Sequence, residues 1–252
     1  MRIAALYDIH GNLPALEAVL SEVEAERVDL VIVGGDVVAG PLPFATLRAL
    51  RDLPVPTRFI RGNAESEVLR AASGQAPGSF SKRADDEAYW VAATLSPDDL
   101  RFIESWPMTV ELEVEPHGRV LFCHATPDSD TRVFTDRSPE AVVQSLFRGV
   151  GAGLVVCGHT HLPFDRAVGS ARVVNAGSIG MPFGQPGADW LLLGERIAPR
   201  HTMYDLEAAA ERVRRSDYPH AESFARGSIL SVPGVELAFQ MLGGLESRQG
   251  SP

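Results

Sequence analysis

The sequence predicts an α/β fold with parallel strands in its core, because short apolar runs alternate with segments of helical periodicity over the first third of the chain. Apolar runs at 3–7, 30–33 and 55–60 are separated by helix-period segments at 13–27 and 43–51. A β-α-β-α-β order needs crossover connections, which are right-handed and place the strands in parallel. Further strands, joined as hairpins, are expected near the C-terminus, so the sheets as a whole are expected to be mixed; they lie at 171–175, 190–193 and 201–206.

The first elements carry clear start and stop signals. Asn12 stands at the N-cap position of the first predicted helix, and Pro14 lies inside its first turn. The apolar run at 30–33 is stopped by Gly34-Gly35-Asp36, and the run at 55–60 is stopped by Gly62-Asn63. Glycine at these points lets the backbone turn sharply and allows other groups to approach it closely.

The middle of the chain changes character. Residues 66–106 are predicted to be mostly helical, with a break at 73–79, and are expected to form a helical cap or insert. Ser96-Pro97-Asp98-Asp99 is typical of a helix start, with serine as the N-cap and acidic residues in the first turn. The segments 109–114 and 120–123 flank a turn and predict a hairpin.

The second half is predicted to contain a helix opening at Ser138-Pro139-Glu140, a strand at 154–157 and a helix at 207–215. The last residues, 243–252, are polar and are expected to be a frayed, flexible tail. No repeat or low-complexity block divides the chain, so residues 1–252 are expected to form a single domain.

Composition and charge exclude several classes of protein. The chain has 252 residues, of which 45% are hydrophobic and 22% charged, as is typical of a globular protein rather than a disordered one. No apolar run approaches the ~18 residues of a membrane span, and the expected location is the cytoplasm. A net charge of −10 argues against nucleic acid as a partner, because the chain repels the phosphate backbone. Two cysteines, Cys123 and Cys157, are too few for a disulfide scaffold and are expected to be buried thiols.

Polar side chains able to bind metals follow five of the predicted strands. Each of them alone has an ordinary explanation, such as an aspartate in a turn or a histidine on the surface. The same placement after five separate strands, however, indicates that the side chains belong to one site. Sites in α/β proteins form beyond the carboxyl ends of the strands. In extended chain, positions i and i+2 point the same way, which pairs Asp8 with His10 and His159 with His161. The full set is Asp8, His10, Asp36, Asn63, His124, His159 and His161.

Seven candidate ligands are too many for one ion and suit two. Asp36 lies midway along the set, and its two carboxylate oxygens allow it to bridge. Two ions about 3.5–4 Å apart clamp a phosphoryl group and lower the pKa of a bound water, which becomes the nucleophile. Mixed His, Asp and Asn ligation suits Mn, Fe, Zn, Co or Ni better than Ca or Mg. The expected cofactors are therefore two divalent transition-metal ions, with Mn²⁺ the first choice in vitro.

The motif set resembles the calcineurin-like metallophosphoesterase superfamily, and in particular its small bacterial and archaeal phosphodiesterase branch. Asp8-x-His10, Gly35-Asp36, Gly62-Asn63, His124 and Gly158-His159-x-His161 occur in the order of that family, and Asn175-Ala-Gly-Ser178 resembles a further segment of the branch. The resemblance covers roughly residues 1–195. It implies a four-layer αββα sandwich, in which two mixed sheets face each other and helices lie outside.

The resemblance also implies the role of each residue. One metal ion would be held by Asp8, His10, Asp36 and His161, and the other by Asp36, Asn63, His124 and His159. Asn63 and His124 are the expected catalytic residues, and Asn63 is also placed to touch the phosphate. Ser178 is expected to brace the backbone near His161 rather than to act as a nucleophile.

The chain departs from the family pattern at one position. Relatives with Gly-Asn-His-Asp/Glu use that histidine as a general acid, but here the segment reads Gly62-Asn63-Ala64-Glu65. Alanine donates no proton, and general acid catalysis is worth ~10²–10⁴-fold in rate. The expected substrates are small phosphate esters or nucleotides whose leaving groups need little protonation, in phosphodiester, phosphoanhydride or activated phosphomonoester linkage. His117, His201 and His220 are expected to be surface histidines rather than replacement acids.

Two other functions are compatible with the sequence. The first is a non-catalytic metal-binding interaction module on the same fold, which the loss of the histidine at Ala64 favours and the intact ligand set opposes. The second is a nuclease, which the net charge of −10 opposes. The sequence leaves open the physiological substrate, the native metals, the preference for monoesters or diesters, and the oligomeric state.

Overall fold

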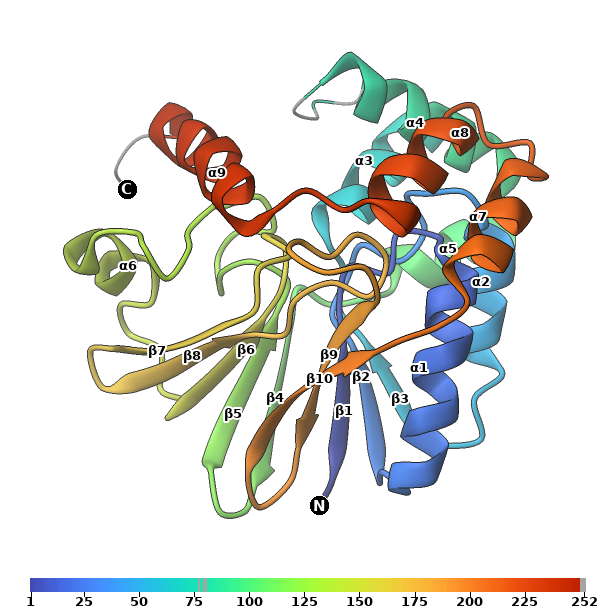
Figure 1. Cartoon of the computed structure of the whole chain (residues 1–252). Coiled ribbons are helices and arrows are strands. Elements are labelled where there is room, and N and C mark those ends of the chain that lie inside the picture. The colour runs from blue at the N-terminus through green and yellow to red at the C-terminus, as the bar shows by residue number, and fades with distance from the viewer. Residues whose placement is uncertain (77, 79–80, 250–252) are drawn as a thin grey trace.

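Two five-stranded sheets pack face to face, and helices cover the outer face of each (Figure 1). The computed structural model describes residues 1–76, 78 and 81–249. Both sheets are mixed, and the order of layers is helices, sheet, sheet, helix. The four-layer sandwich expected from the motif resemblance is therefore confirmed.

The first sheet has the strand order β10-β9-β1-β2-β3. Its three N-terminal strands pair in parallel, as the alternation of strand and helix predicts. The β9–β10 hairpin adds two antiparallel strands beside β1. The bounds are β1 Ile3–Leu6, β2 Leu30–Val33, β3 Thr57–Phe59, β9 Ala188–Leu193 and β10 Ile197–Thr202.

The second sheet has the strand order β4-β5-β6-β8-β7. Strands β5, β6 and β8 run in parallel, and each edge is closed by an antiparallel partner. The predicted β4–β5 hairpin is confirmed. The bounds are β4 Thr109–Val114, β5 Gly118–Cys123, β6 Leu154–Cys157, β7 Phe164–Val168 and β8 Ala171–Asn175.

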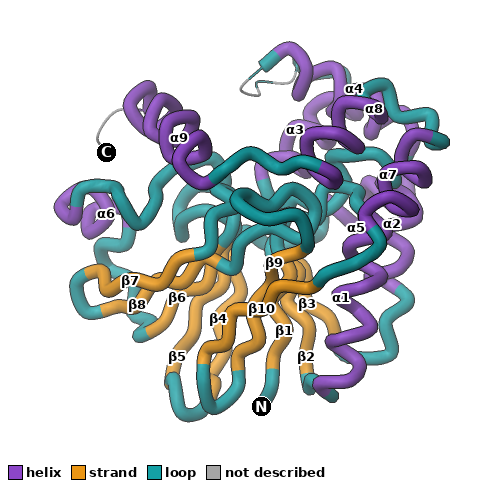
Figure 2. The backbone as a smooth tube through the Cα atoms, viewed as in Figure 1, coloured by secondary structure: helices purple, strands orange, loops and turns teal. Residues whose placement is uncertain are grey.

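The helices gather on the outer faces and above the carboxyl ends of the parallel strands. Figure 2 shows loops collected between those strand ends and the helices α3 and α9. Over the part of the chain that the structure describes, no helix combines the length and apolar character that crossing a bilayer requires. The bounds are α1 Leu13–Glu26, α2 Pro43–Arg51, α3 Asn63–Ala72, α4 Lys82–Thr94, α5 Pro97–Glu104, α6 Glu140–Leu146, α7 Leu206–Arg214, α8 Ala221–Phe224, the π-helix η1 Ala225–Leu230 and α9 Val235–Gln249.

The predicted helix caps are present. The Asn12 side chain accepts a hydrogen bond from the Ala15 N–H at 3.3 Å and so caps α1. Ser96 caps α5 by accepting from the Asp99 N–H at 3.2 Å, and the Asp99 carboxylate returns a contact to Ser96. These bonds satisfy backbone donors that the first turn of a helix leaves without partners.

The second half differs from its prediction in several places, and α8, η1 and the start of α9 were not predicted. The strand expected at 201–206 lies earlier, because β10 pairs with β9 from Ile197 to Thr202 and Asp205 then caps α7. Strand β7 is not among the predicted strands. Residues 243–249, expected to be a frayed tail, form the end of α9, while 250–252 and residues 77, 79 and 80 of the expected cap lie outside the described residues.

The core between the sheets follows strand alternation. Val120 and Phe122 of β5 face the first sheet, whereas Leu121 and Cys123 face outward toward α6. Cys157 lies on that outer side as well, and both cysteines are buried free thiols, as expected. Since the central strands β1, β2 and β6 are buried along their whole length, they hold the loops that follow them at fixed positions.

We expect Phe122→Ala to destabilise the protein by about 3–5 kcal/mol, because it removes a fully buried ring from between the two sheets. Urea unfolding followed by circular dichroism measures this loss. Phe44→Ala is the matched control, since the Phe44 side chain is 47% exposed on α2 and its removal leaves no cavity. Equal effects of the two substitutions would contradict the assignment of Phe122 to the inter-sheet core.

Candidate metal centre

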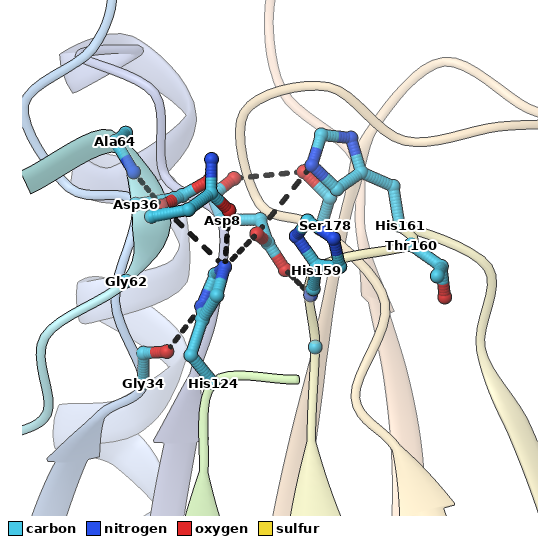
Figure 3. Close-up of polar contacts among 12 residues, drawn as sticks. Asp8, Gly34, Asp36, Gly62, Ala64, His124, His159, Thr160, His161 and Ser178 are labelled. Carbon is cyan, nitrogen blue, oxygen red and sulfur yellow. Dashed lines mark hydrogen bonds and ion pairs between the residues drawn. The ribbon is translucent and has the colours of Figure 1, made fainter. Parts of the chain in front are cut away.

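Loops following β1, β2, β5 and β6 bring six of the seven candidate ligands together at one end of the two sheets. Figure 3 shows Asp8, Asp36, His124, His159 and His161 among them. They form two groups, and within each group the ligand atoms lie within 4.8 Å of one another. Each group draws side chains from both sheets. The groups are Asp8, His10 and His161, and Asp36, His124 and His159.

The two groups meet at the carboxylates. Asp36 Oδ1 lies 3.4 Å from His124 Nε2, while its Oδ2 lies 3.8 Å from His10 Nε2 in the other group. Asp8 Oδ1 lies 3.4 Å from His161 Nε2 and 3.9 Å from His124 Nε2. Both carboxylates therefore approach histidines of both groups, and Asp36 does so with a different oxygen for each group.

Backbone carbonyls fix the orientation of three imidazoles. The Nδ1 atoms of His10, His124 and His161 contact the carbonyl oxygens of Ala39 at 3.0 Å, Gly34 at 2.8 Å and Met181 at 3.0 Å. An Nδ1–H that donates to a carbonyl leaves Nε2 with a free lone pair directed into the site. This arrangement is typical of histidines that bind metals, because it selects the tautomer and holds the ring.

Five of the candidate ligands have a left-handed backbone conformation. This conformation is uncommon for residues other than glycine and costs of order 1 kcal/mol or more each. Such strain persists only where the surrounding structure enforces it, and it clusters at functional sites. The φ angles are 52° for Asp8, 50° for His10, 53° for Asp36, 67° for His159 and 58° for His161.

Burial and neighbouring charges shift the pKa values of the clustered side chains in opposite directions. Burial raises the pKa of Asp8, but the charges of His161 and His124 hold it below its ordinary value. Burial likewise opposes ionisation of Asp36, yet His124 holds the pKa of that carboxyl well below its usual range. Burial alone would lower the pKa of His124, but the charge of Asp36 raises it to about 10. Burial lowers the pKa of His159 to about 4. Protons and cations thus compete for the same lone pairs beside two ionised carboxylates.

The donor atoms fit a divalent cation. Asp8 Oδ1 is buried and accepts no hydrogen bond, so this carboxylate oxygen is left for another electropositive partner. One amide atom of Asn63 lies 3.1 Å from His124 Nε2, 2.9 Å from His159 Nδ1 and 3.2 Å from the Asp130 carbonyl oxygen. As the amide nitrogen, that atom donates to all three acceptors, and rotating the amide by half a turn would present its oxygen at the same point. The set of imidazole and oxygen donors suits transition metals.

Glycines allow the site to close, as the sequence predicts. A Cβ atom on Gly62 would lie 2.3 Å from Asp36 Oδ1, and one on Gly158 would lie 2.4 Å from Asp8 Oδ2. Both distances are far below van der Waals contact. The backbone itself therefore forms part of the wall behind the two carboxylates.

Glu65 positions the site, a role that sequence reasoning missed. Its fully buried carboxylate accepts hydrogen bonds from four backbone N–H groups, which tie the loop after β2 to the start of α3. A glutamate three residues after the N-cap residue Gly62 occupies the capping-box position of a helix. This spacing is the sequence pattern from which the role of Glu65 could have been predicted. The donors are Asp36 at 2.8 Å, Val37 at 2.7 Å, Val38 at 3.2 Å and Gly62 at 3.0 Å.

Two other predicted residues support the site from behind. Ser178 Oγ donates to the Asp8 carbonyl oxygen at 2.7 Å and accepts from the Met181 N–H at 2.8 Å, so it braces the backbone as expected. The Asn12 amide donates to the Gly180 carbonyl oxygen at 3.1 Å besides capping α1. Both residues fix the loop that carries Met181, whose carbonyl orients His161.

The remaining histidines lie outside both groups. His117 contacts the Gly194 carbonyl oxygen at 2.8 Å, in the turn between β4 and β5. His201 pairs with Asp189 at 2.7 Å, and His220 precedes α8. Ala64 lies in the first turn of α3, where its N–H donates to Asp36 Oδ1 at 2.9 Å.

Facing mixed sheets with carboxylates and imidazoles gathered at their strand ends define an αββα protein with a candidate metal centre. A family model described as the calcineurin-like phosphoesterase superfamily domain matches residues 1–194. The chain belongs to this superfamily, whose activity depends on metal ions, as its motifs indicate.

Individual proteins resemble this chain in sequence or in fold. The chain is 26% identical over 237 residues to the uncharacterized protein MJ0912 of Methanocaldococcus jannaschii, covering 86% of this chain and 93% of that protein. It resembles the crystal structure of a metallophosphoesterase from Sphaerobacter thermophilus, with a TM-score of 0.68, 25% identity and coverage of 89% and 97% of the two chains. The hypothetical protein PH1004 of Pyrococcus horikoshii OT3 has the same fold, with a TM-score of 0.78, 17% identity and coverage of 92% and 99%.

We expect Glu65→Ala to destabilise the protein by at least about 3 kcal/mol, because it leaves buried backbone N–H groups without acceptors at ~1–3 kcal/mol each. Urea unfolding in the presence of a chelator measures the effect without any contribution from bound metal. Glu104→Ala is the control, since Glu104 is exposed at the end of α5. A Glu65 variant as stable as the control would show that the four contacts contribute nothing.

Proposed function

We propose that the protein is a phosphoesterase that depends on two divalent transition-metal ions and hydrolyses phosphodiester, phosphoanhydride or activated phosphomonoester bonds. One observation carries this proposal: two three-residue ligand groups lie side by side, and Asp36 faces both of them. Membership of a phosphoesterase superfamily supports the same reaction class. Small phosphate esters and nucleotides are the proposed substrates, and Mn²⁺ is the proposed metal for reconstitution.

The ligands divide between the two ions as the motif resemblance implies. Asp8, His10 and His161 would hold one ion, and His124, His159 and Asn63 would hold the other. Asp36 would serve both, since its two oxygens face opposite groups. Bound at these positions, divalent ions lower the pKa of water and neutralise the charge that develops on a transferring phosphoryl group.

The chain's own groups supply orientation and polarity. The Nδ1 contacts of His10, His124 and His161 keep these rings from rotating during turnover. Asn63 stands at the first position of α3, within reach of both His124 and His159, and is the proposed contact to the phosphate. Glu65 and Ser178 act as positioning residues, because they bind only backbone of the site loops.

The side chain at position 64 sets the leaving-group preference. Ala64 follows Asn63 in the first turn of α3 and offers no proton to a departing alkoxide. The leaving groups of aryl esters and phosphoanhydrides are weak bases and need little protonation, so these compounds are the favoured substrates. Esters of simple alcohols are expected to react slowly.

We expect metal-stripped protein to hydrolyse bis(p-nitrophenyl) phosphate only after Mn²⁺ is added, and a chelator to abolish the rate. Release of p-nitrophenolate, followed by absorbance, measures the reaction. His124→Ala should lower the rate by more than the ~10–100-fold that loss of an outer metal partner costs, because His124 is a proposed direct ligand.

His117→Ala is the control for this experiment, since His117 lies in a turn outside both ligand groups. It should retain the rate of the unmodified protein. Absence of any rate with Mn²⁺, Ni²⁺, Co²⁺ or Fe²⁺ would remove the enzymatic proposal and favour a metal-binding interaction module.

We expect Ala64→His to accelerate hydrolysis of an alkyl phosphodiester by ~10²-fold or more, and that of bis(p-nitrophenyl) phosphate much less. A restored proton donor helps in proportion to the basicity of the leaving group. The ratio of kcat/KM for the two substrates is the measurement. Ala72→His, at the exposed end of the same helix, is the control and should leave the ratio unchanged. An equal gain on both substrates from Ala64→His would refute the leaving-group argument.

A further inference from the structure

The last helix, α9, lies against loops that carry the candidate ligands. Figure 1 shows α9, in red, on the same side of the sheets as the loops that follow β6 and β8. This helix begins at Val235, beyond the residues 1–194 that the family model matches. It contacts three loops, which follow β5, β6 and β8.

The apolar face of α9 forms a small core of its own with the ligand loops. Ala238 and Leu242 pack with Val133, which lies in the loop after His124, and with Leu162. Leu162 is buried and directly follows His161 in sequence. Burial of these side chains fixes the distance between the helix and two ligand-bearing loops.

Polar contacts at the end of α9 fix the loop after β5. The Gln249 side chain accepts from the Val133 N–H at 2.8 Å and donates to the Thr131 carbonyl oxygen at 2.6 Å. The same loop holds the Asp130 carbonyl oxygen, 3.2 Å from the Asn63 amide. Gln249 thus contacts the same stretch of backbone that contacts Asn63, a proposed ligand of the second ion.

Contacts along the rest of α9 anchor the far end of that loop. Arg137 pairs with the Glu236 carboxylate, and its guanidinium carbon lies 3.6 Å from the centre of the Phe239 ring. Ser138 Oγ donates to Glu246 Oε2 at 2.9 Å. One helix therefore holds the loop at two places, around Thr131–Val133 and at Arg137–Ser138.

The third loop meets the segment that leads into α9. The Gly184 N–H donates to the Pro233 carbonyl oxygen at 2.9 Å. Phe183 packs on the α9 core, and its ring lies 6.0 Å from the His161 ring. The loop also contains Met181, whose carbonyl orients His161.

We propose that α9 is a positioning element for the metal centre, and that Leu242 and Gln249 hold the loops presenting His124, His159 and His161 in their metal-binding arrangement. His159 and His161 have left-handed backbone conformations, which relax unless neighbouring structure enforces them. The inference rests on the metal-binding part of the proposed function and is independent of the phosphoesterase reaction.

The test is titration of metal-stripped protein with Mn²⁺ by calorimetry at low temperature, where every variant is folded. Leu242→Ala removes an apolar contact, and Gln249→Ala removes polar ones. We expect each to raise the Kd for Mn²⁺ about tenfold, the lower end of the cost of losing an outer metal partner. The matched control is Met241→Ala, because Met241 neighbours Leu242 but is 53% exposed, against 8% for Leu242.

Thermal unfolding of the metal-free variants separates positioning from general stability. A purely structural helix would lower Tm in Leu242→Ala while the folded protein bound Mn²⁺ as before, and this result would overturn the inference. Equal weakening in all three variants would overturn it too, since the exposed face of α9 would matter as much as the buried one. Mn²⁺ binding by the unmodified protein without any hydrolysis would remove the proposed reaction and leave this inference standing.

Discussion

Two ionised carboxylates, Asp8 and Asp36, lie buried within one cluster, and much of the surrounding structure serves to make this possible. Burying charge is costly unless it is paired or bonded. Imidazoles therefore surround the carboxylates, and glycine backbone closes in behind them. The left-handed residues at the strand ends and the four hydrogen bonds of Glu65 are further conditions for the same arrangement.

Sequence reasoning succeeded where a local pattern has a single physical meaning. Helix caps at Asn12 and Ser96 were recognisable from sequence, and polar residues placed directly after apolar runs predicted the strand ends at which six of the seven candidate ligands gather. The parallel arrangement follows from the crossovers, and it brings the strand ends to a common edge. The four-layer architecture needed the motif resemblance in addition, because alternation alone does not pair one sheet with another.

Failures occurred where long-range contacts decide the structure. Gly243 and Gly244 lower the helix propensity of the last segment by ~1 kcal/mol each, yet packing on Val133 and Leu162 makes it helical. The register of β10 is set by its pairing with β9 across a short hairpin and not by an apolar pattern of its own. Glu65 gave only a helix-cap signal, since its four donors come from two segments that the fold brings together.

The division of the ligands between the sheets has a thermodynamic consequence. Each group combines residues that follow strands of the first sheet with residues that follow strands of the second, so a bound ion is a cross-link between the two halves of the sandwich. An ion that binds only the assembled site adds its binding free energy to the free energy of unfolding. If the site binds metal as proposed, the stability of the folded chain would depend on the concentration of free metal around it, and removal of metal would favour unfolding.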